Sequence, residues 1–170
     1  MAIWVFVEHR EGTIRKVCYQ MMGKARELAD KAGQELWAVV LGQGAESVAE
    51  EIAAYGPPQK VLLVESEALA QYTSDAYGKV LADLIAQHQP AVVLFGATLT
   101  GKDLSPCVAA RLGCGLATDC VGLDIDGQGN LTARRPIYAG KAYVEVSFEG
   151  RPQMASVRPN AFPMPAPAAQ

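Results

Sequence analysis

The stretch that decides the fold is "PAVVLFGATLTGKDLSP", which runs from Pro90 to Pro106. It joins a continuous apolar run to a loop that contains two glycines, and then to a more polar segment. A short apolar run bounded by turn residues is typical of a strand buried on both faces of a sheet. We therefore expect a strand over 90–97 that runs through a turn into a helix over 103–112. Pro106 would lie in the first turn of that helix, where its missing N–H has no intrahelical partner.

The residues before this stretch repeat the alternation of strand and helix. Continuous apolar runs predict strands over 3–8, 35–42 and 60–66. Apolar residues at three- and four-residue spacing predict helices between Thr13 and Gly33, over 45–55 and over 74–88. In the first helix Thr13 is the expected N-cap and Gly33 the expected stop. This alternation predicts a mainly parallel sheet between two layers of helices, which is a three-layer α/β fold.

The pattern changes after Leu112. Four short strand candidates follow, at 118–126, 130–140, 141–150 and 152–159. Turns such as "DGQGN" and "EGRP" separate them, and glycine-containing turns between short strands are typical of antiparallel hairpins. We expect one domain over 1–159. The remaining residues, 160–170, are rich in proline and alanine and are interpreted as a linker or tail.

The composition excludes several classes of protein. Half of the residues are hydrophobic, 19% are charged and the net charge is −3, without a basic stripe, so nucleic-acid binding is not expected. The apolar runs are far shorter than the roughly 20 residues that a membrane-spanning helix needs. The four cysteines have no C-x-x-C spacing and the chain has two histidines, which argues against a metal site and fits a reduced, cytoplasmic setting. No transit peptide for a mitochondrial matrix protein is evident.

The loop from Gly96 to Asp103 fits the first seven positions of a phosphate-binding loop, G-x-x-x-x-G-K. The free N–H groups of the following helix could bind a phosphate, with Thr98, Gly101 and Lys102 as candidate contacts. Asp103, however, stands where the motif needs the Ser or Thr that holds Mg²⁺. The alternative is an ordinary turn between strand and helix, in which the glycines give backbone freedom and Asp103 caps the helix.

Four further residues are candidates for a protein interface. Arg135, Tyr138 and Gly140 belong to "RRPIYAG", and Arg158 follows in "SVRPNAF". Tyr and Arg are enriched at interface hot spots. The alternatives are a hairpin turn with Tyr138 packed on the sheet, and an exposed strand end at Arg158. Lys102 remains open among a ligand contact, an interface charge and a solvated side chain.

Four stretches carry a family resemblance: "VFVEHREGTI" (5–14), "GATLTGKDLSPCVAARLGCGLATDC" (96–120), "RRPIYAGKAYVEV" (134–146) and "SVRPNAFP" (156–163). Together they resemble the electron transfer flavoprotein α-subunit family, and in the expected order they extend from residue 5 to residue 163. The resemblance is to the N-terminal domain only, and it implies an adenine-nucleotide-hydrolase-like sandwich. Family members often have T-F-G-K-N where this chain has Thr100-Gly101-Lys102-Asp103 after Leu99, so the loop chemistry differs locally.

The resemblance implies an electron carrier with no catalytic residues in this domain. An FAD-binding domain would follow the tail and hold most of the FAD, with no cofactor expected in this chain alone. The partner would be a β-subunit, with dehydrogenases as electron donors and a quinone-linked or other acceptor. The alternative is a stand-alone adenine-nucleotide-binding module that uses the loop from Gly96 to Asp103. In the family the corresponding crevice of β-subunits holds AMP, whereas in α-subunits it is generally not a nucleotide site.

Overall fold

The computed structural model describes residues 1–168 and has an α/β fold. Its central sheet contains six parallel strands in the order β5-β4-β1-β6-β11-β7. These strands are β1 (Ala2–Val7), β4 (Glu35–Gly42), β5 (Lys60–Glu65), β6 (Val92–Gly96), β7 (Leu116–Cys120) and β11 (Gln153–Val157). Four helices cover them: α1 (Lys16–Ala32), α2 (Glu46–Ala53), α3 (Ser74–His88) and α4 (Leu99–Leu112).

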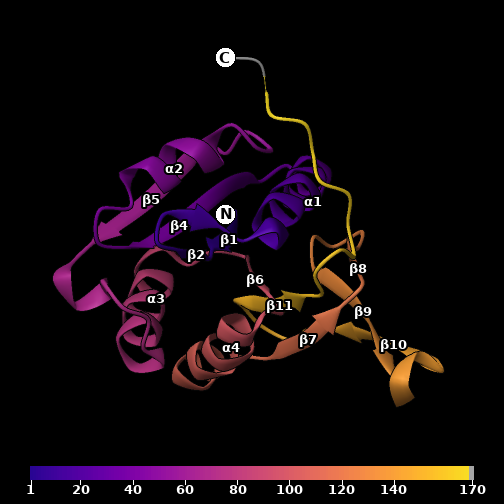
Figure 1. The fold of residues 1–170 in the computed structure, drawn as a ribbon. Coiled ribbons are helices and arrows are strands. Elements are labelled where there is room, and N and C mark those ends of the chain that lie inside the picture. The colour runs from indigo at the N-terminus through magenta and orange to yellow at the C-terminus, as the bar shows by residue number, and fades with distance from the viewer. Residues whose placement is uncertain (169–170) are drawn as a thin grey trace.

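Two apolar layers hold the helices on the sheet, as the predicted three-layer sandwich requires. Strand side chains alternate between the two faces, so Ile3, Val5 and Val7 of β1 pack with α1 and α2. Trp4 and Phe6 of the same strand pack in the other layer, with residues of α3 and α4. The two pairs of helices lie on opposite faces of the sheet (Figure 1). Because β1 is buried on both faces, it shows the continuous apolar run read from the sequence.

The last strand of the chain, β11, corrects the prediction that the segment 152–159 is an antiparallel hairpin strand. It lies between β6 and β7 and is parallel to both, so β7 also belongs to the central sheet. Met154 and Ala155 are fully buried on opposite faces. The chain crosses from β6 through α4 to β7 and leaves room for one strand between β6 and β7 in the sheet. The apolar strand β11 fills this position.

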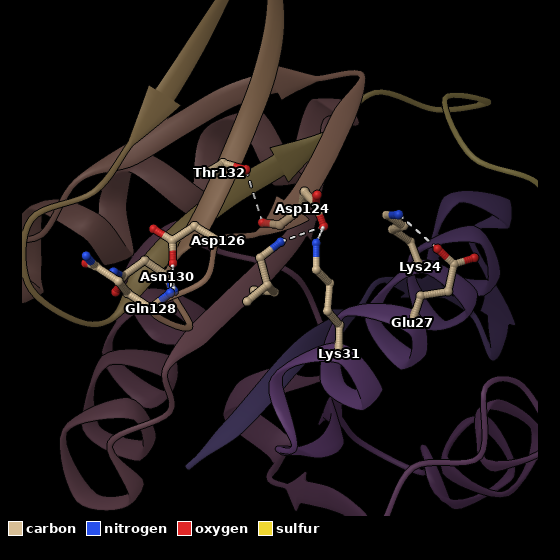
Figure 2. A network of polar contacts seen from close by, with 9 residues as sticks. Lys24, Glu27, Lys31, Asp124, Asp126, Gln128, Asn130 and Thr132 are labelled. Atoms are coloured by element: carbon tan, nitrogen blue, oxygen red, sulfur yellow. Dashed lines mark hydrogen bonds and ion pairs between the residues drawn. The ribbon is translucent and has the colours of Figure 1, made fainter.

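The predicted antiparallel hairpins are confirmed for the three-stranded sheet formed by β8 (Gly122–Ile125), β9 (Leu131–Ile137) and β10 (Ala142–Ser147). Its inner side chains join the core next to α1. On its outer side, Lys31 of α1 donates to the Asp124 carboxylate over 2.6 Å (Figure 2). The Asp126 carboxylate accepts the backbone N–H groups of Gln128 and Asn130, which shapes the turn between β8 and β9.

The start of α1 differs from the sequence prediction. Thr13 is not the N-cap, because the short strand β3 (Thr13–Ile14) pairs with β2 (His9–Arg10). The helix begins at Lys16 with Arg15 as N-cap, and the Arg15 N–H donates to the Glu8 carbonyl over 2.9 Å. Gly33 is the expected stop, with a left-handed φ of 62°.

Residues 158–168, which we call the strap, contain no helix or strand but lie along α1 toward α2 (Figure 1). The buried Gln20 side chain accepts the Asn160 N–H over 3.0 Å and donates to the Asn160 side chain over 3.4 Å. Pro165 packs on Gly23, where a Cβ would lie 3.1 Å from the proline ring. The Ala168 N–H donates to the Ala54 carbonyl over 2.8 Å. The strap is thus held at both ends.

Replacing Gln20 with alanine is expected to loosen the strap. The change removes both hydrogen bonds to Asn160, each contributing about 1 kcal/mol. Hydrogen exchange of the amides in 158–168 should then be about tenfold faster or more. Gln87→Ala, at an exposed position of α3, is the control and should leave this exchange unchanged. Parental exchange in the Gln20 variant would show that other contacts hold the strap.

Candidate functional site

The two glycines of the loop that follows β6 are required by packing inside the protein. A Cβ on Gly101 would lie 1.7 Å from the carbonyl oxygen of Gly96, and a Cβ on Gly96 would lie 2.7 Å from a methyl carbon of Val17. Real side chains essentially never come this close to a neighbour. The spacing G-x-x-x-x-G therefore lets the first turn of α4 sit directly on the end of β6 and on α1.

The start of α4 corrects the expected helix over 103–112 and the expected cap at Asp103. Thr98 is the N-cap, and its hydroxyl oxygen accepts the Gly101 N–H over 2.9 Å. Asp103 lies in the second turn, where its carboxylate accepts the Tyr72 hydroxyl over 2.6 Å. Pro106 consequently lies in the interior of the helix and not in its first turn. The capping threonine, five residues before Asp103, was the missed signal.

Glu8 occupies the crevice where an open α/β sheet usually binds its ligand. β4 lies on one side of β1 in the sheet and β6 lies on the other side, so the strand order reverses direction between β1 and β6. The crevice therefore lies at the carboxyl ends of β1 and β6. Glu8 directly follows β1, is 7% exposed and accepts the Thr98 hydroxyl. Its carboxylate also lies 3.5 Å from Nε of Arg15. A buried carboxylate here would repel a phosphate group.

Arg158 pairs with a residue that sequence reasoning missed, Asp119, and the charges of Lys102 and Arg135 act on the same carboxylate. We call these four residues the Asp119 cluster. Arg158 donates from Nε and Nη2 to the two carboxylate oxygens of Asp119, over 3.0 Å and 2.5 Å. These bonds hold the pKa of the Asp119 carboxyl below its ordinary value, and the charges of Lys102 and Arg135 lower it further.

A bulge in β7 aims the Asp119 side chain. The pairing between β7 and β11 shifts register at this point, and Asp119 has a left-handed φ of 57°. Its N–H donates to the hydroxyl oxygen of the buried Ser156 over 3.0 Å. A left-handed aspartate beside a strand end leaves little trace in a sequence, which explains why it was missed.

The tip of the β9–β10 hairpin corrects the alternative in which Tyr138 packs on the sheet. Tyr138 is 78% exposed. It begins three consecutive residues with positive φ, Tyr138, Ala139 and Gly140, at 50°, 55° and 85°. Non-glycine residues in this conformation are uncommon and concentrate at functional sites. Next to the tip, the guanidinium carbon of Arg134 on β9 lies 4.4 Å from the centre of the Tyr143 ring on β10.

The other titratable groups near the crevice have structural partners. Nε2 of His9 lies within hydrogen-bonding distance, 2.9 Å, of the Leu41 carbonyl oxygen. Burial raises the pKa of the Cys18 thiol to about 12, so this thiol stays protonated and poorly nucleophilic at neutral pH.

Among residues 1–168, no group of three or more potential metal ligands gathers. No helix in the same range is long and apolar enough to cross a membrane.

The ion pair between Asp119 and Arg158 allows a prediction about pH. Because the folded-state pKa of Asp119 is lowered, the pair stabilises the fold above the ordinary aspartate pKa and loses this effect as the pH falls through the folded-state value. Arg158→Gln should raise the Asp119 pKa toward its ordinary value, measured by NMR of the carboxyl carbon. Asp126, whose pKa is lowered by backbone N–H groups of Asn130 and Gln128, should be unchanged. A parental Asp119 pKa in the variant would contradict the pairing.

The fold and the site define a class of protein: an α/β domain with an open parallel sheet, whose crevice holds its own carboxylate and whose exposed hairpin carries part of a basic cluster. A family model described as "Electron transfer flavoprotein domain" matches residues 3–170. The chain therefore belongs to the electron transfer flavoprotein family.

Named relatives agree with this assignment. The chain is 43% identical to the electron transfer flavoprotein subunit alpha of Clostridium acetobutylicum over 162 residues, which are 94% of this chain and 48% of the relative. It is 40% identical to protein FixB of Azorhizobium caulinodans, over 96% of this chain and 45% of the relative. It is 44% identical to the acryloyl-CoA reductase electron transfer subunit beta of Anaerotignum propionicum, over 73% of this chain and 34% of the relative. The chain spans about half the length of the alpha-subunit and FixB relatives.

Proposed function

We propose that this chain acts as the N-terminal domain of an electron transfer flavoprotein α-subunit. In this role it forms the interface with a β-subunit and supports an FAD-binding domain that carries electrons from dehydrogenases to a quinone-linked or other acceptor. The names of the relatives and the match of their N-terminal parts support the assignment. As in a carrier, the cofactor would supply the electron chemistry and the protein would supply binding and orientation.

The observation that carries the interface proposal is the exposed hairpin between β9 and β10. Tyr138 is 78% exposed and is the first of three left-handed residues, a conformation that costs free energy and concentrates at functional sites. Tyrosine and arginine are the side chains that most often anchor protein interfaces. Arg135, Tyr138 and Gly140 would therefore contact the β-subunit, with Arg158 beside them at the end of β11.

The strap supports the proposed connection to the FAD-binding domain. Residues 160–170 would form the linker to that domain, and the part described here follows α1 as far as Ala54 of the α2 end. A following domain would therefore start near α2. That domain would hold most of the FAD. The bacterial relatives favour the cytoplasm as the location.

The stand-alone nucleotide module fits the site less well. Thr98 and Gly101 are used by the fold, since Thr98 caps α4 and Gly101 packs on Gly96. Lys102 belongs to the Asp119 cluster, and Glu8 places a buried carboxylate in the crevice. Calorimetry should accordingly detect no micromolar binding of AMP or ATP. Micromolar binding that Lys102→Ala abolishes would establish the nucleotide module instead.

Subunit pairing is the direct test of the proposed function. The α-chain is mixed with the electron transfer flavoprotein β-subunit of the same organism and analysed by size-exclusion chromatography and by titration. We expect a one-to-one complex, and Tyr138→Ser should weaken it about tenfold or more, as the loss of an interface anchor does. The matched control is Lys79→Gln on the exposed face of α3. A chain that stays monomeric beside the β-subunit would overturn the proposal.

A further inference from the structure

Backbone hydrogen bonds join the carboxyl ends of β6, β11 and β7 to one another and to β9, and the adjoining segments carry three cations. The Ala97 N–H donates to the Val157 carbonyl over 2.7 Å, and the Arg158 N–H donates to the Cys120 carbonyl over 2.9 Å. The Val121 N–H donates to the Arg134 carbonyl over 2.8 Å, which fixes β9 next to β7. Through these bonds Lys102 on α4, Arg158 after β11 and Arg135 on β9 share one edge.

The positive charge of this edge exceeds its negative charge. Asp119 is paired with Arg158, and among residues 1–168 no carboxylate lies within 4.0 Å of the charged nitrogens of Lys102 or Arg135. Nε of Arg135 is buried without a hydrogen-bond partner in this range. Buried cationic donors normally have an acceptor, because a buried donor that makes no hydrogen bond costs free energy. The surplus contrasts with the net charge of −3 for the whole chain.

The edge is also built to hold one arginine in a fixed orientation. The bulge puts Asp119 in a left-handed conformation, and the buried Ser156 hydroxyl holds its backbone N–H. The Asp119 carboxylate binds Nε and Nη2 of Arg158, which leaves Nη1 free to bind a further group. A fixed guanidinium loses less conformational entropy on binding, so Asp119 acts as a positioning residue.

We propose that Lys102, Arg135 and Arg158 form a docking site for carboxylate side chains on the surface of the partner subunit. The planar guanidinium groups of the two arginines match the geometry of carboxylates, and Lys102 adds a point charge. The proposal rests on the proposed function for the identity of the partner. Charge complementarity indicates an acidic patch there, facing Lys102 and Arg135, which have no paired carboxylate among residues 1–168, and Arg158, which is paired with Asp119.

The test measures the dissociation constant between the α-chain and its β-subunit at about 50 mM and about 500 mM NaCl, where screening changes strongly. The parent complex should weaken with salt. Lys102→Gln and Arg135→Gln should each weaken the complex about tenfold at low salt and reduce its salt dependence. Arg135→Lys, which keeps the charge in the half-buried position, should remain closer to the parent. Lys79→Gln removes a distant charge and should change neither quantity.

A separate readout isolates the role of Asp119. Asp119→Asn removes the charge that positions Arg158 but leaves the three cations, so it should reduce the affinity without reducing the salt dependence. Circular dichroism and the urea midpoint of each variant show that it is folded. Affinity equal to that of the parent would overturn the positioning role.

The outcomes separate this inference from the proposed function. If Tyr138→Ser weakens pairing while the charge variants keep the affinity and salt dependence of the parent, the docking site is wrong and the proposed function stands. If the chains do not pair at all, both are wrong. If the charge variants leave pairing unchanged but lose binding of inorganic pyrophosphate, the site takes phosphate groups, which also overturns the carboxylate proposal.

Discussion

Replacing Gly101 with alanine is expected to lower the free energy of unfolding by about 3 kcal/mol or more. The added Cβ would lie 1.7 Å from the Gly96 carbonyl oxygen. That oxygen is a backbone atom and the backbone fixes the position of the Cβ, so neither atom can rotate away. The first turn of α4 would have to lift from the end of β6, which also breaks the Thr98 cap. Urea denaturation without any nucleotide measures this loss directly.

A control at Gly127 distinguishes packing from a general effect of added side chains. No atom lies within 4 Å of a Cβ built there, so Gly127→Ala should change the free energy of unfolding by less than about 0.5 kcal/mol. A Gly101→Ala protein as stable as its parent would contradict the packing explanation. The glycine of the motif would then have to serve a ligand.

Gly56→Ala is expected to cost about 3 kcal/mol, from two sources. Gly56 has a φ of 59°, and an L-residue in this region costs about 1 kcal/mol. Its Cβ would also lie 2.5 Å from the Met22 carbonyl oxygen of α1, and such overpacking costs about 2 kcal/mol. The turn after α2 would move off α1, and with it Ala54, which accepts the last hydrogen bond of the strap.

The matched control for Gly56 is Gly44, which has a similar φ of 64° but no atom within 4 Å of an added Cβ. Gly44→Ala should therefore show the conformational cost alone, about 1 kcal/mol. The difference between the two variants in urea denaturation measures the contact with α1. In the Gly56 variant, hydrogen exchange of the strap should also rise. Equal losses at the two positions would show that the close approach to Met22 contributes nothing.

The elements could be predicted from the sequence because their signals are local. The helix over 74–88 begins and ends as predicted, since its apolar residues follow one face of a helix and Thr73 caps it. Gly33 was recognised because a left-handed helix stop favours glycine. The first helix of the chain was misplaced at its start, since the small β2–β3 hairpin competes for Thr13.

The Asp119 cluster could be predicted only in part. Lys102, Arg135 and Arg158 were candidates on residue type and on the family resemblance, but nothing in their spacing places them together. Their neighbourhood depends on β11 entering between β6 and β7, which the short apolar run "MASV" does not reveal. Asp119 depends on the bulge in that same pairing. Contacts between segments far apart in the chain decide all of this.

The sequence by itself determined the alternation of strands and helices up to Leu112, the antiparallel extension apart from its last strand, and the family, because periodicity, turn chemistry and motifs are properties of neighbouring residues. Only the tertiary structure showed how the loop from Gly96 to Asp103 packs. A G-x-x-x-x-G-K stretch can bind a phosphate or allow the first turn of a helix to pack closely on a strand end, and the amino-acid sequence is the same in both cases. The surrounding atoms make the difference: Gly96 and Val17 fill the space beside the glycines, and Glu8 places a carboxylate in the crevice.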